Sequence, residues 1–197
     1  MELHRTAQRG GPPARTVVAV LAALLLGAGM AAAEPSGSST AREALLLCRH
    51  ADTVTGDERE QALERGLKLA ERAVAADARD ALAHFATVCN LGRQMESAGM
   101  GIGQLFKLRR LRRELDATLE LAPTDSDTLV AKGALLLRLP RLLGGDAVEA
   151  EKLLRRALDA EPGNDTARCY LAHALSVRDA SPDEKAAPAE STEPPHC

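Results

Sequence analysis

Aromatic side chains are scarce in this chain. Its 197 residues include two Phe, one Tyr and no Trp, so aromatics make up 2% of the sequence. A hydrophobic core must therefore be built from Leu, Ala and Val, which argues against aromatic-rich β-sandwiches and barrels and against nucleic-acid modules that stack bases on aromatic rings. The net charge of −3 also argues against general nucleic-acid binding. With 45% hydrophobic and 27% charged residues, the chain nevertheless has a globular composition.

Long apolar runs are missing after the first 33 residues. The run before that point, Val17 to Met30, follows three arginines and precedes three small residues ending at Ala33. This order predicts a secretory signal peptide in residues 1–33, cleaved near Ala33. The apolar run is shorter than the roughly 20 residues of a transmembrane helix; the alternative is an N-terminal anchor that is not cleaved. We therefore expect a periplasmic or secreted protein with no integral membrane span after cleavage.

Two segments outside the expected fold lack an apolar pattern. Residues 34–40 are rich in Ser, Gly and Pro and are predicted to be a polar linker. Residues 178–197 combine Pro, Ala and acidic residues, which predicts a disordered acidic tail. The folded domain is therefore expected to span residues 41–177.

Within that domain, apolar residues recur at intervals of three and four, which predicts helices and no convincing strand. Thr40 with Glu43 is predicted to form a capping box at the first helix. The fifth helix is expected to close at Pro140, and Gly144-Gly145 to be a C-cap glycine pair that supplies an αL position before an N-cap at Asp146. An all-α array follows. Its seven helices are expected at about 41–53, 57–76, 80–93, 104 to just before Pro123, 127–138, 147–160 and 165–177.

The turns between these helices repeat. The segments around Ala78, Pro123 and Pro162 each end one helix and lead, two residues later, into a capping residue of the next. They are spaced by 45 and 39 residues, more than the usual period of about 34 in tetratricopeptide repeats. The capping residues are Asp80, Asp125 and Asn164.

The last unit resembles the tetratricopeptide repeat (TPR) family. The resemblance rests on Ala157, Leu158, Pro162, Asn164, Ala167, Leu171 and Ala172. The first two units depart from the family pattern at Ala78, Thr87, Val88 and Lys132. The resemblance implies an α-solenoid of about three helix pairs plus a final helix, whose inner helices line a concave groove.

A narrower resemblance covers residues 131–146, which end in Leu-Gly-Gly-Asp. This stretch looks like the divergent repeats of the periplasmic proteins associated with TRAP-type transporters, and like those of the regulator of microtubule dynamics family. Both groups are helical scaffolds, and neither implies a reaction or a cofactor. The resemblance therefore implies a scaffold that binds a protein or peptide partner. The alternative is an accessory subunit of a TRAP-like transporter, binding a small ligand or the substrate-binding protein.

The family's groove positions can be carried over to this sequence. Arg93 and Arg138 hold the same place in their repeats, and two guanidiniums in register would bind carboxylates of a partner. The alternative is that both arginines cap carbonyls at their helix ends. The full set of expected groove positions is Phe85, Cys89, Arg93, Val130, Ala134, Arg138, Cys169 and His173.

The repeat resemblance also places Cys48 and Cys89 at similar heights on neighbouring helices. An oxidising compartment would allow a disulfide, provided that the two Cα atoms lie within about 7 Å. That is closer than most facing positions on adjacent helices. The two cysteines are therefore either bridged or unpaired small residues of the core.

Other motifs favour structural roles. The basic run from Lys107 to Arg113 interleaves with leucines and indicates a solvated face with Arg110–Glu114 and Arg112–Asp116 pairs; the alternative is a docking patch for an anionic surface or the acidic tail. Gly99 to Gly103 is expected to be an inter-helix turn, since a phosphate cradle needs a preceding strand and a following Lys-Ser/Thr.

Catalytic and metal sites are not indicated. Cys48 and His50 face apart on a helix, as do His84 and Cys89, so neither pair suggests metal ligation. No pair of a nucleophile and a base has a sequence spacing that indicates a catalytic site. We therefore expect no cofactor, no metal and no enzymatic activity.

Overall fold

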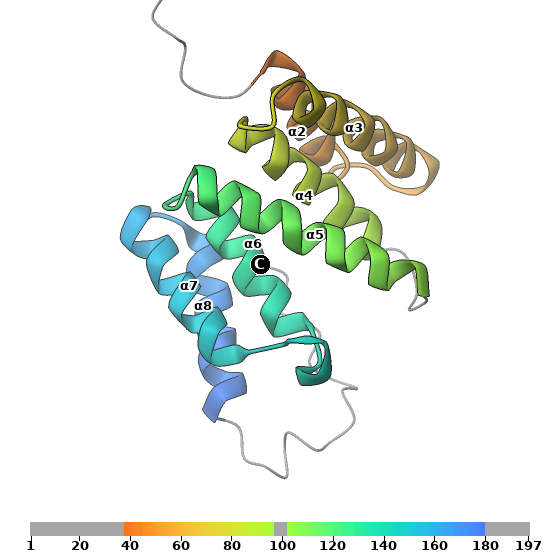
Figure 1. Cartoon of the computed structure of the whole chain (residues 1–197). Coiled ribbons are helices and arrows are strands. Elements are labelled where there is room, and N and C mark those ends of the chain that lie inside the picture. Colours follow the sequence, from red (N-terminus) through yellow and green to blue (C-terminus); the bar gives the residue numbers. More distant parts are fainter. Residues whose placement is uncertain (1–37, 97–101, 180–197) are drawn as a thin grey trace, which may run out of the picture. The chain divides into compact units, whose positions relative to one another are not determined.

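The computed structural model of the chain describes residues 38–96 and 102–179, and in these ranges it contains helices and no strand (Figure 1). The predicted signal peptide of residues 1–33 lies outside the described residues, as do nearly all of the predicted tail and most of the Gly99 to Gly103 segment. The helices are α2 (Ser39–His50), α3 (Gly56–Ala76), α4 (Ala81–Glu96), α5 (Ile102–Leu121), α6 (Ser126–Arg138), the 3-10 helix η1 (Arg141–Leu143), α7 (Ala147–Ala160) and α8 (Asp165–Asp179).

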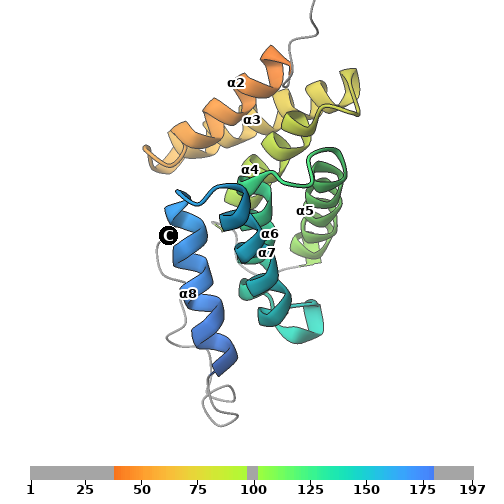
Figure 2. The ribbon, with the colours of Figure 1, turned by 90° about the vertical axis from the view of Figure 1, so that its left-hand side faces the viewer.

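Successive helices pack against one another as hairpins. Contacts join α2 to α3, α3 to α4, α4 to α5, α6 to α7 and α7 to α8. Alternate helices also touch, because α2 packs against α4 and α6 against α8. Figure 2 shows α6 between α5 and α8, with which it makes smaller contacts than with α7. This nearest-neighbour packing is that of a helical solenoid, so the predicted all-α solenoid architecture is confirmed.

The repeated turn residues cap helices. Asp80 accepts a hydrogen bond from the backbone N–H of Ala83 at 3.2 Å, and Asp125 accepts one from Thr128 at 2.8 Å. Asn164 accepts one from Ala167 at 2.9 Å. Each side chain satisfies a backbone donor that the first helical turn leaves without an intrahelical partner. The recurring punctuation of the sequence is therefore a recurring N-cap.

Two boundaries differ from those expected. The cap of α2 is Ser38, not Thr40, because the Ser38 hydroxyl accepts the N–H of Ala41 at 3.1 Å and the helix begins at Ser39. At the other point, α4 continues through Gly92 and reaches Glu96 rather than ending near residue 93. A glycine inside a helix weakens it without ending it. The extra turn places Glu96 on the helix, which matters for the site described below.

The Gly-Gly turn supplies the predicted αL position at Gly144, but the helix that it caps is a short one that was not expected. Gly144 has φ of +81° and caps η1, not the fifth predicted helix, whose structural counterpart α6 ends at Arg138. Gly145 is constrained by space instead, since a Cβ there would lie 1.7 Å from the carbonyl oxygen of Leu139. Asp146 caps α7 as expected, accepting N–H donors from the first turn at 2.9 and 3.1 Å.

Small residues bring α2, α3 and α4 together. Each helix contributes one alanine to each of two buried clusters, Ala41 with Ala73 and Ala83, and Ala44 with Ala70 and Ala86. Alanine layers of this kind let the three helices approach closely. Further along, Gly66 makes room for Asn90, whose amide nitrogen donates to the carbonyls of Ala44 at 3.0 Å and Ala86 at 2.8 Å.

Leucine joins alanine in the core formed by the later helices. Leu111 and Leu115 of α5 pack with Val88 and Leu91 of α4, and Leu135 of α6 packs against this cluster. Leu129, Leu153 and Leu154 form the main cluster of α6, α7 and α8, together with Val130, Ala134, Ala157, Ala167, Tyr170 and Ala174. None of the described helices combines the length and apolarity needed to cross a membrane.

Candidate functional site

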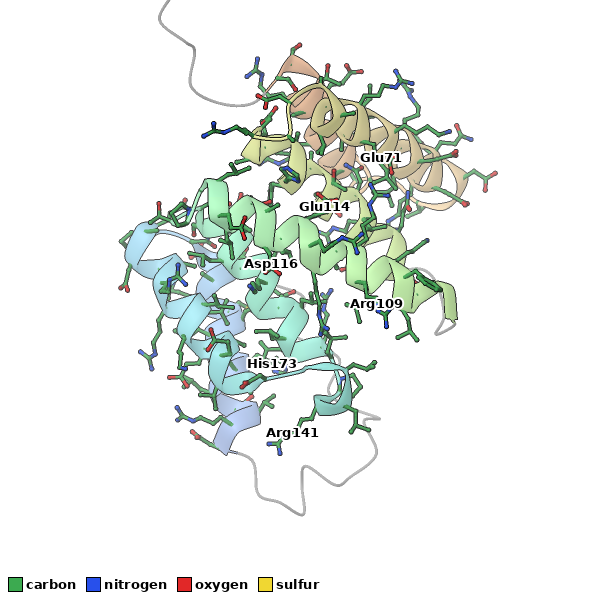
Figure 3. The ribbon with its side chains drawn as sticks, in the orientation of Figure 1. Glu71, Arg109, Glu114, Asp116, Arg141 and His173 are labelled. Carbon is green, nitrogen blue, oxygen red and sulfur yellow. A yellow bond between two sulfur atoms is a disulfide. The ribbon has the colours of Figure 1, made fainter. Side chains whose placement is uncertain are left out.

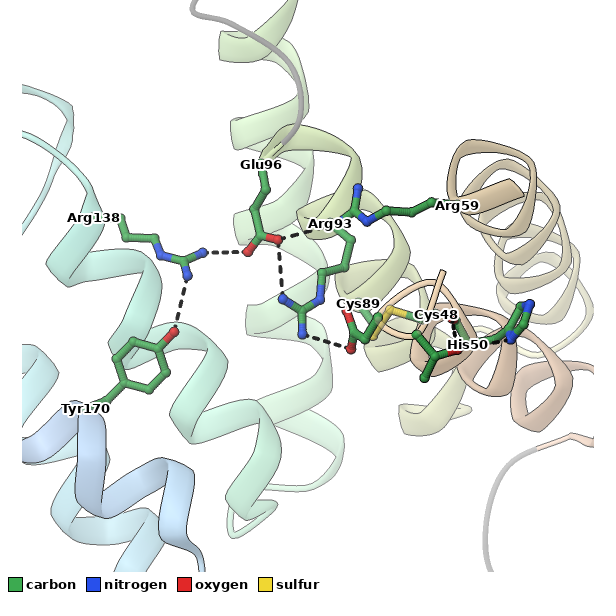
Figure 4. Close-up of polar contacts among 10 residues, drawn as sticks. Cys48, His50, Arg59, Cys89, Arg93, Glu96, Arg138 and Tyr170 are labelled. Atoms are coloured by element: carbon green, nitrogen blue, oxygen red, sulfur yellow. Dashed lines mark hydrogen bonds and ion pairs between the residues drawn. A yellow bond between two sulfur atoms is a disulfide. The ribbon is translucent and has the colours of Figure 1, made fainter. Parts of the chain in front are cut away.

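Three arginines from three helices converge on one carboxylate (Figure 4). Arg138, the last residue of α6, donates from Nη1 to Glu96 Oε1 at 2.7 Å. Arg93 of α4 donates from Nη1 to Glu96 Oε2 at 3.3 Å, and Arg59 of α3 lies 3.9 Å from the same oxygen. We call Arg59, Arg93, Glu96 and Arg138 the Glu96 cluster.

Two further contacts extend the Glu96 cluster. The second nitrogen of Arg93 donates to Asp52 Oδ2 at 3.1 Å, in the connection after α2. The second nitrogen of Arg138 donates to the Tyr170 hydroxyl of α8 at 3.2 Å. A continuous series of polar contacts thus runs from the connection that follows α2 to helix α8.

Charge at the cluster is unbalanced. Three guanidiniums face two carboxylates, Glu96 and Asp52. Burial works to lower the pKa of Arg93, but Glu96 and Asp52 outweigh it and hold that pKa above its ordinary value. The side chains of Arg93 and Arg138 are 39% and 40% exposed, and that of Glu96 is 33% exposed. An anionic group from solution can therefore reach guanidiniums that are already oriented.

The helix ends explain why arginines gather here. Arg93 and Arg138 lie in the last turns of α4 and α6, where the backbone carbonyls give the helix end partial negative charge. Glu96 stands at an unfavourable end of α4 for an acidic residue, and the arginines offset that repulsion. Glu96 is therefore held in place by Arg93 of its own helix and by Arg59 and Arg138 of two other helices.

The structure brings together two of the residues expected in the groove. Arg93 and Arg138 meet, as their equal places in the repeats suggested, but they meet on Glu96 of the same chain. Their contacts are to side chains and not to helix-end carbonyls, so the capping alternative does not describe them. Glu96 was missed because the third predicted helix ended too early; its spacing of three residues from Arg93 was the available signal.

The other expected positions lie elsewhere. Val130 is 7% exposed and belongs to the core of α6, α7 and α8, so it is removed from the set of partner-binding residues as a correction. Ala134 is buried in the same cluster. Phe85, Cys169 and His173 are half-buried and lie outside the Glu96 cluster.

Cys48 and Cys89 form a disulfide, with their Cα atoms 6.1 Å apart. The bridge joins α2 to α4 one turn before Arg93, and Cys48 is fully buried. Asp52 and Arg93 follow the two cysteines on their respective elements, so the covalent link restrains the spacing between those two charges. Figure 4 shows the disulfide beside the Glu96 cluster.

A second polar group stabilises the packing of α3, α4 and α5. His84 lies 2.7 Å from Glu114 through Nδ1 and 3.1 Å from the carbonyl of Ala78 through Nε2. Both ring nitrogens of His84 therefore face oxygen atoms of neighbouring segments. Arg110 donates to Glu71 at 2.7 Å and lies 3.8 Å from Glu114. Figure 3 labels Glu71 of α3 and Glu114 of α5, the two carboxylates that Arg110 contacts.

The expected pairs in α5 are thus half realised. Arg110 and Glu114 do interact, but Arg112 does not pair with Asp116. Arg112 donates instead to the backbone carbonyl of Leu143 in η1, and Asp116 binds Lys132 of α6 at 2.7 Å. Contacts between helices replace a contact within one helix because α6 and η1 pack close to this face of α5.

A hollow of about 250 Å³ lies between α5 and α6, away from the expected groove positions. Its lining includes Arg112, Asp116 and Lys132, whose charges are largely used by the contacts just described. Leu115, Leu135 and Leu136 supply the apolar part. Among the described residues, no cluster of three or more His, Cys, Asp or Glu is arranged to hold a metal.

Comparisons with known proteins yield a fold likeness of low similarity. No family model matches the chain, and no curated protein matches it. Among solved structures, the chain is similar to the first TPR of Spaghetti (RPAP3) bound to the HSP90 peptide SRMEEVD, with 16% identity and a TM-score of 0.49. The match covers 71% of this chain and 96% of that chain. A likeness of this degree assigns neither a ligand nor a partner to this chain, and the fold rests on the helix packing described above.

Proposed function

We propose that this chain is an exported, non-catalytic helical scaffold that binds an acidic segment of a partner protein at the Glu96 cluster. The observation that carries the proposal is the convergence of Arg59, Arg93 and Arg138 on a partly exposed site with one excess positive charge. Guanidiniums fixed in this way bind carboxylates through paired N–H donors.

Binding would proceed by exchange of carboxylates. Glu96 occupies the arginines in the free chain, and a carboxylate of the partner would take over part of its contacts. The rest of the recognition would come from neighbouring side chains of the repeats, among which Phe85 is the half-buried aromatic of α4.

Export is the second part of the proposal. It is supported by the order of charges and apolar residues in 1–33, and by the Cys48–Cys89 disulfide, because disulfides persist in oxidising compartments. A periplasmic or secreted location is therefore proposed for the processed chain.

A fluorescein-labelled peptide of alternating Leu and Glu is a suitable probe of the site. Arg93→Ala and Arg138→Ala should each weaken its binding, measured by fluorescence anisotropy, whereas Glu96→Ala should strengthen it. Arg155→Ala is a matched control, because Arg155 is an exposed arginine of α7 that pairs with Glu151. Unchanged binding in the Arg93 and Arg138 variants would contradict the proposal. Loss of binding in an Arg109→Glu/Arg113→Glu variant, with the cluster variants unaffected, would move the site to α5.

An accessory role in a TRAP-like transporter is a second candidate. The observation that favours it is the Leu-Gly-Gly-Asp turn, where Gly144 adopts positive φ and Asp146 caps α7, so the residues that carry the resemblance form a defined local structure. Co-purification with a substrate-binding protein encoded beside the same gene would support this role. Co-purification alone would not bear on the Glu96 cluster. It would do so only if the cluster variants also reduced the co-purification.

A further inference from the structure

The outer face of α5 carries exposed apolar side chains next to exposed cations. Phe106 is 66% exposed and Leu105 is 46% exposed. Arg109 and Arg113 follow at intervals of three to four residues from Phe106 and are exposed as well. On a helix this spacing places the four side chains along one strip, opposite the buried Leu108, Leu111 and Leu115.

The turn of η1 lies beside this strip. Arg112 of α5 donates to the carbonyl of Leu143, which holds η1 against the helix. At the tip of the turn, Leu142 is 98% exposed and Arg141 is exposed next to it. Figure 3 shows Arg109 on α5 and Arg141 on η1, with both side chains directed away from the ribbon. We call Leu105, Phe106, Arg109, Arg113, Arg141 and Leu142 the α5–η1 patch.

The cations of the α5–η1 patch are not used by the fold. Arg110 and Arg112, which flank the strip, bind Glu71 and the carbonyl of Leu143. Within residues 38–96 and 102–179, by contrast, no carboxylate forms an ion pair with Arg109, Arg113 or Arg141. The chain as a whole is acidic, with net charge −3, so this local group of unpaired cations has the opposite sign to the net charge of the chain.

We propose that the α5–η1 patch docks on an anionic phospholipid surface. Phenylalanine and leucine at its exposed points would enter the boundary between headgroups and acyl chains. The arginines beside them would remain at the depth of the lipid phosphates, where their long side chains reach the charge. Exposed apolar side chains such as Leu142 beside unpaired arginines are the combination that binds the surface of an anionic bilayer. This interaction is separate from peptide binding at the Glu96 cluster.

Single-tryptophan reporters test the proposal in the full chain, which has no native Trp. Phe106→Trp gives the patch reporter, and Leu46→Trp gives the α2 reporter, at a leucine of α2 that is 64% exposed. With vesicles containing phosphatidylglycerol and phosphatidylcholine, emission of the patch reporter should shift to shorter wavelength and be quenched by brominated lipid. The α2 reporter should show neither effect. Vesicles of phosphatidylcholine alone should leave both reporters unchanged.

Charge variants identify the cations. In the Phe106→Trp background, Arg109→Glu/Arg113→Glu should weaken vesicle binding by more than about tenfold. Arg65→Glu/Arg72→Glu makes the same charge change at exposed arginines of α3 and should leave binding near its original strength. Circular dichroism checks that all variants keep their helices. Each reporter senses only its own surroundings. A shift of the patch reporter without a shift of the α2 reporter therefore cannot result from insertion of the N-terminal apolar segment alone.

Three results would overturn the proposal. Unshifted emission of the patch reporter with anionic vesicles would leave a protein partner as the occupant of the patch. Emission at short wavelength before vesicles are added, and unchanged by them, would indicate that the acidic residues 180–197 of the same chain cover the patch. Equal loss of vesicle binding in the α3 control would show that binding depends on the net charge of the protein and not on the patch.

Discussion

Arg138 and Glu96 are joined by a 2.7 Å hydrogen bond although 42 residues separate them in the chain. The contact ties the end of α6 to the end of α4, and Arg93 and Tyr170 extend it on either side. Because the ion pair is partly exposed, its worth to the fold is small and its arginine remains open to other carboxylates. The same geometry therefore serves local order and the proposed binding.

The coupling between these two residues can be measured directly. In a double-mutant cycle of Glu96→Gln and Arg138→Met, urea denaturation should give a coupling free energy of about 0.5–1 kcal/mol. A matched cycle on Glu64 and Lys68, an exposed pair within α3, should give a smaller value. A coupling at Glu96 and Arg138 no larger than that of the control would show that the contact adds nothing to stability.

Removal of the disulfide should lower stability substantially. The bridge closes a loop of 41 residues, and the chain-entropy model assigns about 4 kcal/mol to such a loop. We expect Cys48→Ala/Cys89→Ala to lower the urea midpoint accordingly. Mass spectrometry of the native protein should find the peptides of Cys48 and Cys89 linked. Unlinked peptides, or a variant with an unchanged midpoint, would contradict the bridge.

Adjacent glycines should differ in their response to alanine. Gly144→Ala should cost about 1 kcal/mol because of its positive φ, while Gly145→Ala should cost more, because its Cβ would meet the Leu139 carbonyl. Gly163→Ala is the control, since no atom lies within 4 Å of its added Cβ. Thermal melting orders the three variants. A Gly145→Ala variant that melts like the wild type would mean that the turn relaxes freely.

Acidification should remove the contribution of Glu151 to the stability of the fold. Its hydrogen bond from Arg155, together with Arg178, holds the pKa of Glu151 below the ordinary 4.5 despite partial burial. A lowered pKa stabilises the fold above about 4.5, and this stabilisation disappears as the pH falls through the folded-state pKa. Glu151→Gln should therefore melt below the wild type at pH 7, and the gap should close at acidic pH.

The exposed Asp159 of the same helix provides the control for this experiment, through Asp159→Asn. Melting curves of the three proteins between pH 7 and pH 2.5 give the comparison. A gap between wild type and Glu151→Gln that persists at the lowest pH would assign the effect to packing rather than to charge.

Export makes a prediction about the N-terminus. N-terminal sequencing of the protein recovered from its producing cell should begin at Glu34, after the three alanines that end at Ala33. A chain that begins at Met1 and is found in the membrane fraction would favour a retained anchor instead.

Local signals located the helices well. The residues Asp80, Asp125 and Asn164 cap the helices that follow them, because capping depends on a side chain and the three backbone groups next to it. Gly92 misled the prediction, since a glycine weakens a helix without necessarily ending it. Because the predicted helix ended one turn too early, the prediction did not include Glu96, which is the acceptor for Arg93 and Arg138.

The sequence by itself determined the all-α class, the helix order and the equivalence of Arg93 and Arg138, because periodicity and capping are properties of neighbouring residues. Only the tertiary structure decided which carboxylate those arginines bind, that Val130 is buried, and that Arg112 supports η1 instead of pairing with Asp116. The physical reason is that such contacts depend on the lengths and packing of helices far apart in the chain. Periodicity within one helix carries no information about the side chains that another helix brings to it.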